Sequence, residues 1–279
     1  MKITFLGTAA AEGVPAVWCN CPLCTEARKN GGKDIRTRSQ VMIDDCLLID
    51  FPMDTYMHAI TNKLSLSNVG AVFISHAHMD HCYPQEFSLR GLPFAHKMKC
   101  KTVTVHGDET VISALEREVP KKLREGISKS VVTRVLHPYD SVTASGGYTV
   151  TALPAMHTKG EECLIYAISD GKKTALIFND SGILPLSTYE KVASLGLKFD
   201  LVSFDCTYGY ARRGEGRHMG ALDADGERKK MQKCGLLKES TKYVLTHFSH
   251  NGKLNHEKLC KKTEKLNFIV AYDGMGIEV

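Results

Sequence analysis

The chain has 279 residues, of which 43% are hydrophobic and 24% charged, and its formal net charge is +5 at pH 7. This composition is typical of a globular protein with a sizeable buried core. No run of five or more like charges appears, so the mild positive charge does not indicate a nucleic-acid-binding surface, although it would suit a small anionic substrate. The apolar segment at residues 3–6 is too short for a membrane span or the core of a signal peptide. We therefore expect a cytoplasmic protein, away from membranes, whose ten cysteines are thiols, metal ligands or nucleophiles and not disulfides.

Short strands and helices follow one another along the whole chain. Runs rich in β-branched and aromatic residues predict strands at 3–7, 39–44, 46–51, 71–75, 102–105, 130–136, 148–154, 163–169, 174–180, 200–205, 243–248 and 268–274. Helical periodicity predicts helices at 22–30, 54–63, 85–90, 109–124, 186–195, 220–235 and 255–264. The Asp-Gly pair at 170–171 predicts a hairpin. With no linker or repeat, we expect one domain over residues 1–279, in which two sheets pack face to face under outer helices, a four-layer αββα architecture of the α/β class.

The segment "HAHMDH" directly follows the apolar run "AVFIS" and holds four potential metal ligands, His76, His78, Asp80 and His81. Neither the helical period of 3.6 nor the strand period of 2 would point all four at one spot. A loop that turns into a helix could instead direct two ligands to one metal and two to another. Imidazole with carboxylate suits Zn, Mn, Fe or Ni. A solvated loop is the alternative, and three histidines with an aspartate at a strand end argue against it.

Three further polar residues stand at the ends of apolar runs: His157 after "YTVTALPAM", Asp180 after "TALIFN" and His247 after "YVLT". Each alone would more often be structural or solvated. Because α/β proteins gather their sites at the carboxyl ends of strands, these residues together complete the ligand set of a binuclear centre.

The segment "VWCNCPLC" places Cys19, Cys21 and Cys24 within six positions. Such crowding in a loop favours a structural zinc site over three buried thiols, but such a site needs four protein ligands. The spacing alone does not identify the fourth.

These motifs resemble the metallo-β-lactamase superfamily, and within it the PhnP family of phosphoribosyl cyclic phosphodiesterases. The segments "LGTAAAEGVPAVWCNCPLC", "LTHFSH" and "YDGMGIEV" occur in the same order as in that family. The resemblance implies the metallo-β-lactamase fold, a structural zinc closed by His250 and an Asp50 that supports the metal loop. It also implies two divalent catalytic ions, Mn or Zn, with Fe or Ni as options. One ion would be bound by His76, His78 and His157, and the other by Asp80, His81 and His247. Asp180 would be a ligand of both.

The same resemblance implies an activity: hydrolysis of a small cyclic phosphodiester of the phosphoribosyl 1,2-cyclic type, or of a nucleotide-like one, by a hydroxide that bridges the two ions. It assigns His218 as the general acid, and Asp80 is counted with it as catalytic. Arg212, Arg213 and Arg217 could hold a second phosphate, or they could form a solvated basic loop. The alternatives are a PqqB-like protein of cofactor biosynthesis, disfavoured by the intact "HAHMDH", and a tRNA 3′-processing nuclease, disfavoured by the lack of a long basic arm. Whether the chain forms a homodimer is left open.

Overall fold

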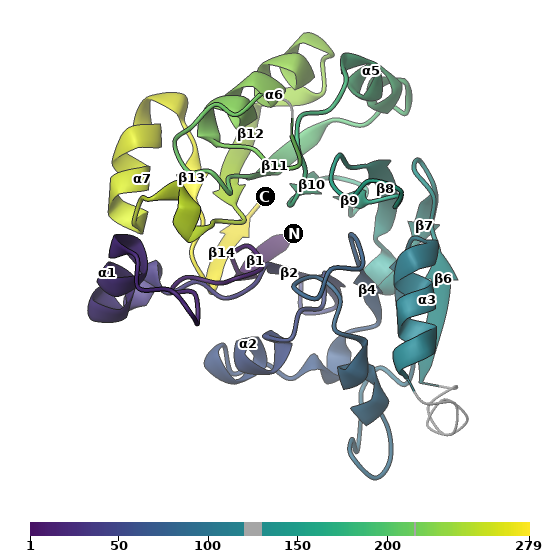
Figure 1. Ribbon diagram of the computed structural model, residues 1–279. Helices are drawn as coiled ribbons and strands as arrows, with labels where there is room; N and C mark the ends of the chain where they lie inside the picture. The colour runs from purple at the N-terminus through teal and green to yellow at the C-terminus, as the bar shows by residue number, and fades with distance from the viewer. Residues whose placement is uncertain (120–129, 215) are drawn as a thin grey trace.

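The computed structural model describes residues 1–119, 130–214 and 216–279. Within these ranges the strands form two seven-stranded sheets, and helices cover the outer face of each sheet (Figure 1). The predicted four-layer αββα fold is therefore confirmed. None of the helices in the described ranges is long and apolar enough to cross a membrane.

The first sheet has its antiparallel strands at one side and its parallel strands at the other. Its strand order is β14 (Met275–Glu278), β1 (Lys2–Gly7), β2 (Gln40–Ile43), β3 (Leu47–Ile49), β4 (Ala71–Phe73), β5 (Val103–Gly107) and β6 (Val131–Val135). The second sheet has the order β13 (Ile269–Val270), β12 (Leu237–Thr246), β11 (Phe199–Asp205), β10 (Thr174–Phe178), β9 (Leu164–Ser169), β8 (Thr149–Pro154) and β7 (Ser141–Thr143). Strands β10 to β13 run parallel, whereas β7 to β10 are antiparallel neighbours.

The helices lie outside the sheets and leave the inner faces to pack together. Helices α5 (Leu186–Ser194), α6 (Ala221–Lys233) and α7 (His256–Thr263) lie along the second sheet, while α2 (Thr55–Thr61) and α3 (Glu109–Glu118) lie on the side of the first (Figure 1). Helix α1 (Pro22–Asn30) lies beside α7 at one edge of the molecule (Figure 1).

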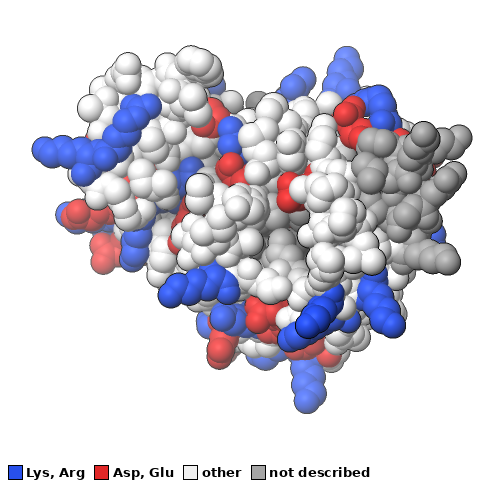
Figure 2. Space-filling view, turned by 90° about the horizontal axis from the view of Figure 1, so that it is seen from below, with Lys and Arg blue, Asp and Glu red and all other residues white. Residues whose placement is uncertain are grey.

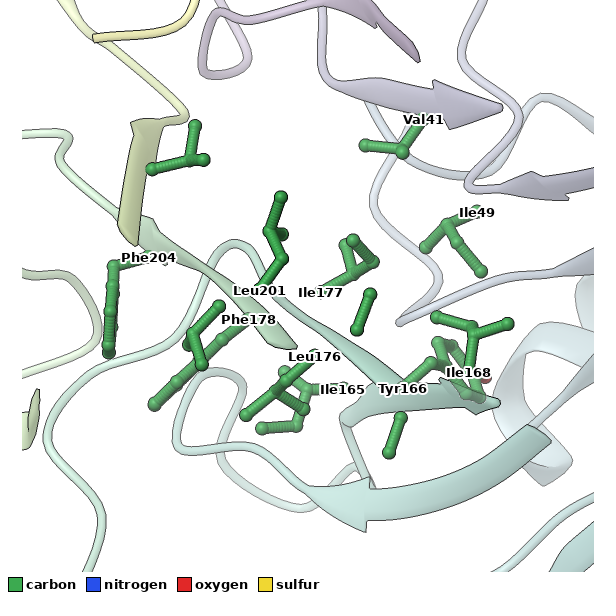
Figure 3. Packing of buried hydrophobic residues seen from close by; sticks show 14 of the residues in the cluster. Val41, Ile49, Ile165, Tyr166, Ile168, Leu176, Ile177, Phe178, Leu201 and Phe204 are labelled. Carbon is green, nitrogen blue, oxygen red and sulfur yellow. The ribbon is translucent and has the colours of Figure 1, made fainter. Parts of the chain in front are cut away.

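The main core lies between the two sheets. Val41 and Ile49 of the first sheet face Ile177 and Leu201 of the second (Figure 3), and all four are at most 2% exposed. Burial of one such aliphatic side chain contributes about 1.5–3 kcal/mol. A second cluster, which includes Val72, Val105 and Leu115, joins the outer face of the first sheet to α3. With both faces of the first sheet buried, the ends of its strands are held firmly in place.

Most predicted elements are present, and the differences have local causes. The hairpin at Asp170–Gly171 is confirmed by the antiparallel pairing of β9 with β10, and α1 spans the predicted residues 22–30. Residues 84–89 form a 3₁₀ helix and not an α-helix. The helix predicted at 109–124 ends at Glu118, and residues 120–124 lie outside the described ranges. Strands β7 and β14 and the first half of β12 were not predicted.

Candidate metal centres

The candidate ligands lie where the carboxyl ends of strands from both sheets meet. His76 follows β4, His157 follows β8, Asp180 follows β10 and His247 follows β12. Asp180 (φ 48°) and His247 (φ 59°) have left-handed backbone conformations. Asp and His tolerate this region better than most residues do. The sharp turns it produces redirect the chain at the end of each strand.

The first ligand set consists of His76, His78, His157 and Asp180, whose donor atoms lie within 4.8 Å of one another. His78 Nδ1 lies 3.0 Å from His76 Nε2 and 3.2 Å from His157 Nε2. A ring nitrogen carries either one proton or one lone pair in the plane of the ring. His78 Nδ1 therefore cannot form good hydrogen bonds with the nitrogens of both His76 and His157 at the same time. Burial lowers the pKa of His157 to about 4 and lowers the pKa of His78 as well. Neutral imidazoles that converge in this way are suited to a cation.

The second set consists of Asp80, His81, Asp180 and His247. His81 Nε2 lies 3.2 Å from both Asp80 Oδ2 and Asp180 Oδ2, and His247 Nε2 lies 3.6 Å from Asp180 Oδ2. All four residues are buried. Asp180 belongs to both sets, so its carboxylate lies between the two candidate positions.

Unsatisfied polar atoms provide a test of whether metal ions fit these sets. His81 Nε2, His247 Nε2 and Asp180 Oδ1 are buried, and although other members of the cluster lie as close as 2.9 Å, none of the described residues makes a hydrogen bond of suitable geometry with these atoms. Buried polar atoms are rarely left without a partner, because desolvation costs about 1–3 kcal/mol each. All three belong to the two ligand sets, whose nitrogen and carboxylate donors suit first-row divalent ions. The residues therefore fit two divalent ions.

Buried acceptors hold the opposite nitrogen of two of these imidazoles. His81 Nδ1 donates to Asp50 Oδ2 at 2.7 Å, and Asp50 Oδ1 accepts from the backbone N–H of Ser75 at 2.8 Å. His247 Nδ1 lies 2.9 Å from Thr207 Oγ1 and 3.2 Å from Asp205 Oδ2. Partners of this kind fix the orientation of ligating histidines. Asp50 has the supporting position that the sequence predicts.

Sequence reasoning missed Asp205, the last residue of β11. It is fully buried, and its Oδ1 accepts from the backbone N–H groups of Thr207 and Met219, both at 2.9 Å. Its Oδ2 lies 3.1 Å from His218 Nδ1. The donors of Asp205, Asp180, His218 and His247 also lie close enough for a metal, but hydrogen bonds already satisfy Asp205. We therefore interpret Asp205 as a positioning residue for His247 and His218. Its place at the end of an apolar run was the signal that could have found it.

Asp205→Asn should weaken metal binding at the second set and lower kcat, each by about 10–100-fold, the usual cost of losing an outer carboxylate. Metal affinity, measured by titration of the apoprotein, reports on His247. The kcat, measured at saturating metal, reports on His218. Asp200→Asn, at the opposite end of the same strand, is the matched control. Unchanged affinity and unchanged kcat would contradict the assignment.

His218 lies at the wall of the cavity above the ligand sets. Its Nδ1 is 2.9 Å from Asp180 Oδ1 and 3.1 Å from Asp205 Oδ2, and its side chain is 23% exposed. Burial lowers its pKa, but the carboxylates of Asp180 and Asp205 outweigh burial and raise the pKa of His218 to about 10. The cavity has a volume of about 320 Å³ and falls within the range of small-molecule sites.

The three arginines predicted to bind substrate are placed differently from one another. Arg217 lines the cavity, and its carbonyl oxygen lies 3.4 Å from His157 Nδ1. Arg213 stacks over the ring of Tyr208 at 4.5 Å from its centroid. Arg212 is exposed and is not part of the described cavity lining. The structure thus brings one of the three arginines to the site.

The cysteine loop meets a distant segment of the chain. The Sγ atoms of Cys19, Cys21 and Cys24 lie 3.2, 3.5 and 3.4 Å from His250 Nδ1. Tetrahedral zinc with ordinary bond lengths separates sulfur from nitrogen by about 3.6 Å. A hydrogen bond from the Cys24 backbone N–H lowers the pKa of Cys21 to about 6, whereas burial raises the pKa of Cys24 to about 11. Three sulfurs and one imidazole form the donor set of a closed zinc site.

The αββα fold and two ligand sets that share a carboxylate define a metal-dependent hydrolase. The chain belongs to the β-lactamase superfamily, since the family model described as "Beta-lactamase superfamily domain" matches residues 47–248. The fold of this superfamily implies divalent metal ions, in agreement with the clusters described above.

Several solved structures are similar over the full length of the chain. One is titled "Crystal Structure of a New Diphosphatase from the PhnP Family"; it has a TM-score of 0.73 and 21% identity, covering 100% of this chain and 97% of that one. Zn²⁺-bound PqqB from Methylobacterium extorquens has a TM-score of 0.74 and 17% identity, with 100% of both chains covered. The short form of human tRNase Z has a TM-score of 0.67 and 19% identity, covering 100% and 99%. Identities this low show a common fold alone. No curated protein matches the sequence significantly.

Proposed function

We propose that the protein hydrolyses a small phosphodiester, either cyclic and of the phosphoribosyl 1,2-cyclic phosphate type or nucleotide-like. One observation carries this proposal: two sets of candidate metal ligands share Asp180, and five of their seven residues line a cavity that Arg217 and His218 also line. A phosphodiester is an anion, and the cavity combines candidate positions for cations with two residues, Arg217 and His218, whose side chains can carry positive charge.

The residues of the two sets would hold two divalent ions, Mn or Zn, with Fe or Ni as options. When bound, such ions lower the pKa of a water molecule to near neutrality and offset the charge on phosphoryl oxygens. Asp180 and Asp80 bring carboxylates to these positions. Arg217, which lines the cavity, would bind a phosphoryl oxygen and orient the diester.

His218 is the proposed general acid. Hydrolysis adds water to phosphorus and breaks one P–O bond, and the departing sugar oxygen then needs a proton. Asp205 and Asp180 face Nδ1 of His218, which leaves Nε2 as the atom for proton transfer to the leaving group. Proton transfer of this kind usually contributes about 10²–10⁴-fold to the rate.

The cysteine loop would hold a structural zinc through Cys19, Cys21, Cys24 and His250. Four protein ligands leave no open position for substrate, so this metal stabilises the fold and takes no part in the reaction. The ligands of the three candidate metal sites, taken together, come from the N-terminal loop and from segments that follow strands of both sheets. We therefore also propose that residues 1–279 function as a single domain.

The two alternatives fit the described residues less well. A tRNA-processing enzyme would present a basic surface for the phosphate backbone, whereas acidic side chains lie among the basic ones on the face shown in Figure 2. A protein without catalytic metals would not require the buried unsatisfied atoms of His81, His247 and Asp180.

The proposal is tested by assaying protein loaded with Mn²⁺ or Zn²⁺ against cyclic and linear diesters, alongside a phosphomonoester and a β-lactam. Diester hydrolysis that disappears with a chelator and returns with metal would support the proposal. Hydrolysis of the β-lactam or the monoester alone would overturn it.

His218→Ala should slow the hydrolysis of a diester with a sugar leaving group by about 10²-fold or more, because the alkoxide needs protonation. A nitrophenolate leaving group needs little protonation, so its rate should fall far less. The measurement is the ratio of the two losses at full metal occupancy. An equal loss of rate on both substrates would mean that His218 positions the phosphate. No loss of rate on either substrate would mean that another group, such as Lys159, donates the proton.

A further inference from the structure

An aromatic side chain stands fully exposed on the cysteine loop. Trp18 is 98% exposed and its neighbour Val17 is 72% exposed. Trp18 is the only tryptophan in the sequence. Tryptophan is usually largely buried, and its wide ring is well suited to stacking.

The backbone that carries Trp18 is held on both sides. Arg28 donates from Nη2 to the carbonyl of Ala16 at 3.0 Å and from Nη1 to the carbonyl of Cys19 at 2.8 Å. Cys19 also belongs to the metal-ligand cluster closed by His250. The loop is thus fixed at positions two before and one after the tryptophan. A ring presented by a fixed loop loses little conformational entropy when it binds a ligand.

Trp18 lines a hollow that adjoins the catalytic cavity. This second hollow has a volume of about 460 Å³ and is also lined by Glu12, Arg38 and His250. Glu12 lines the catalytic cavity as well. Ser249, a lining residue of the catalytic cavity, directly precedes His250. The two hollows therefore meet at Glu12.

The charged residues of the two hollows indicate which part of a substrate fits in each hollow. Arg38 forms an ion pair with Asp54 at 3.0 Å and donates to the carbonyl of Ala11 at 2.8 Å, so its guanidinium is not available to bind a second phosphate. Glu12 Oε1 accepts a hydrogen bond from Ser249 Oγ and lies 3.5 Å from His250 Nε2. The negative charge of Glu12 disfavours an anion at the junction, and its second oxygen, Oε2, can accept a hydrogen bond from a hydroxyl group of a ligand. The order from the metal centre outward is thus a place for phosphate, a place for a hydroxyl-bearing unit and a flat apolar ring.

We propose that Trp18 stacks on the base of a nucleoside-bearing phosphodiester, whose phosphate lies at the metal centre and whose sugar passes Glu12. The inference rests on the proposed diesterase function for the position of the phosphate. It narrows the substrate class to nucleoside-containing diesters, among which stacking tolerates different bases because every base offers a flat ring.

Because Trp18 is the only tryptophan, its fluorescence reports on this subsite without catalysis. The metal-loaded protein is titrated with AMP and with ribose 5-phosphate, with excitation at the red edge of tryptophan absorption. Saturable quenching by AMP and none by ribose 5-phosphate is the expected result. Equal responses to both ligands, or no response to AMP, would overturn the proposal.

Kinetics provide a second readout. Trp18→Ala should raise KM for a nucleoside 2′,3′-cyclic phosphate relative to KM for a base-free ribose cyclic phosphate, so that the ratio of the two KM values increases by about tenfold. Trp18→Phe, which keeps a stacking ring, should restore most of that ratio. An unchanged ratio in Trp18→Ala would overturn the subsite while leaving the diesterase proposal in place. Selective quenching by AMP in a protein that hydrolyses no diester would keep the subsite and overturn the reaction.

Discussion

Asp180→Ala should remove both catalytic metal ions and leave the metal of the cysteine loop in place. Asp180 is the one residue common to both catalytic ligand sets, and it takes no part in the cysteine cluster. Elemental analysis should fall from about three metal ions per chain to about one, and diesterase activity should fall by at least about 10³-fold. Without Asp180, each set would lack one ligand, and two cations held by the remaining residues would repel each other without a carboxylate to offset their charge.

His78→Ala is the informative comparison, because His78 belongs to the first set alone. It should lose about one metal ion where Asp180→Ala loses about two. His137→Ala is a matched control, since this exposed histidine pairs with Glu162 and lies outside all the clusters. Retention of two catalytic ions in Asp180→Ala would refute the shared-ligand arrangement.

The two candidate ligand sets could be predicted because their residues follow a simple rule of chain geometry. His76 and Asp180 each come within three residues of the end of an apolar strand, and the carboxyl ends of these strands meet at one edge of the two sheets. An apolar run is recognisable in sequence, and the polar residue that ends it is therefore recognisable too. Asp205 meets the same criterion at the end of β11, but it has no histidine-rich neighbour in the sequence to draw attention to it.

Elements that depend on partners far along the chain were missed. β14 has only four residues and exists through its pairing with β1, from Lys2↔Glu278 to Phe5↔Met275. The first half of β12 is mostly polar and has a single apolar residue, Leu237, so no alternation of apolar residues marks it. For these segments the pairing energy comes from the neighbouring strand, which local propensity does not contain.

The positions of side chains in the loop before α6 also depend on contacts that the local sequence does not reveal. Arg213 and Arg217 look equivalent in sequence, yet one stacks on Tyr208 and the other lines the cavity. The loop backbone packs closely against the turn after Asp180: a Cβ atom on Gly182 would lie 1.7 Å from the carbonyl oxygen of Gly216. Such contacts decide which arginine reaches the site, and spacing does not reveal them.

One short segment connects the second candidate ligand set to the cysteine cluster. His247 belongs to that set and His250 to the cysteine cluster, three residues apart. The segment is fastened to the N-terminal strand, since Phe248 exchanges backbone hydrogen bonds with Thr8 and Ala10 at 2.8 and 2.9 Å. A metal at the cysteine cluster would hold this junction together, because binding free energy contributes to folding where the site forms only in the folded chain.

Cys21→Ser should therefore destabilise the protein far more than it impairs the chemistry. Cys21 is the N-cap of α1, where its sulfur accepts from the Cys24 N–H. Serine is a favoured N-cap, so the substitution keeps the cap and removes only a metal-binding thiolate. We expect a loss on the order of 3 kcal/mol in unfolding free energy, at the upper end for one substitution, and a Tm lower by about 10 °C. The residual folded protein at low temperature should keep its two catalytic ions and most of its kcat.

Cys234→Ser is the matched control, because Cys234 is half-buried and lies outside the ligand cluster. It should keep the third metal ion and melt within a few degrees of the parent. His250→Ala should reproduce the destabilisation seen in Cys21→Ser, and a strong chelator should lower the Tm of the parent while changing that of either ligand variant much less. If Cys21→Ser and His250→Ala both retain the third metal and melt like the parent, that metal is bound elsewhere. The three sulfurs would then lie around His250 because of packing alone.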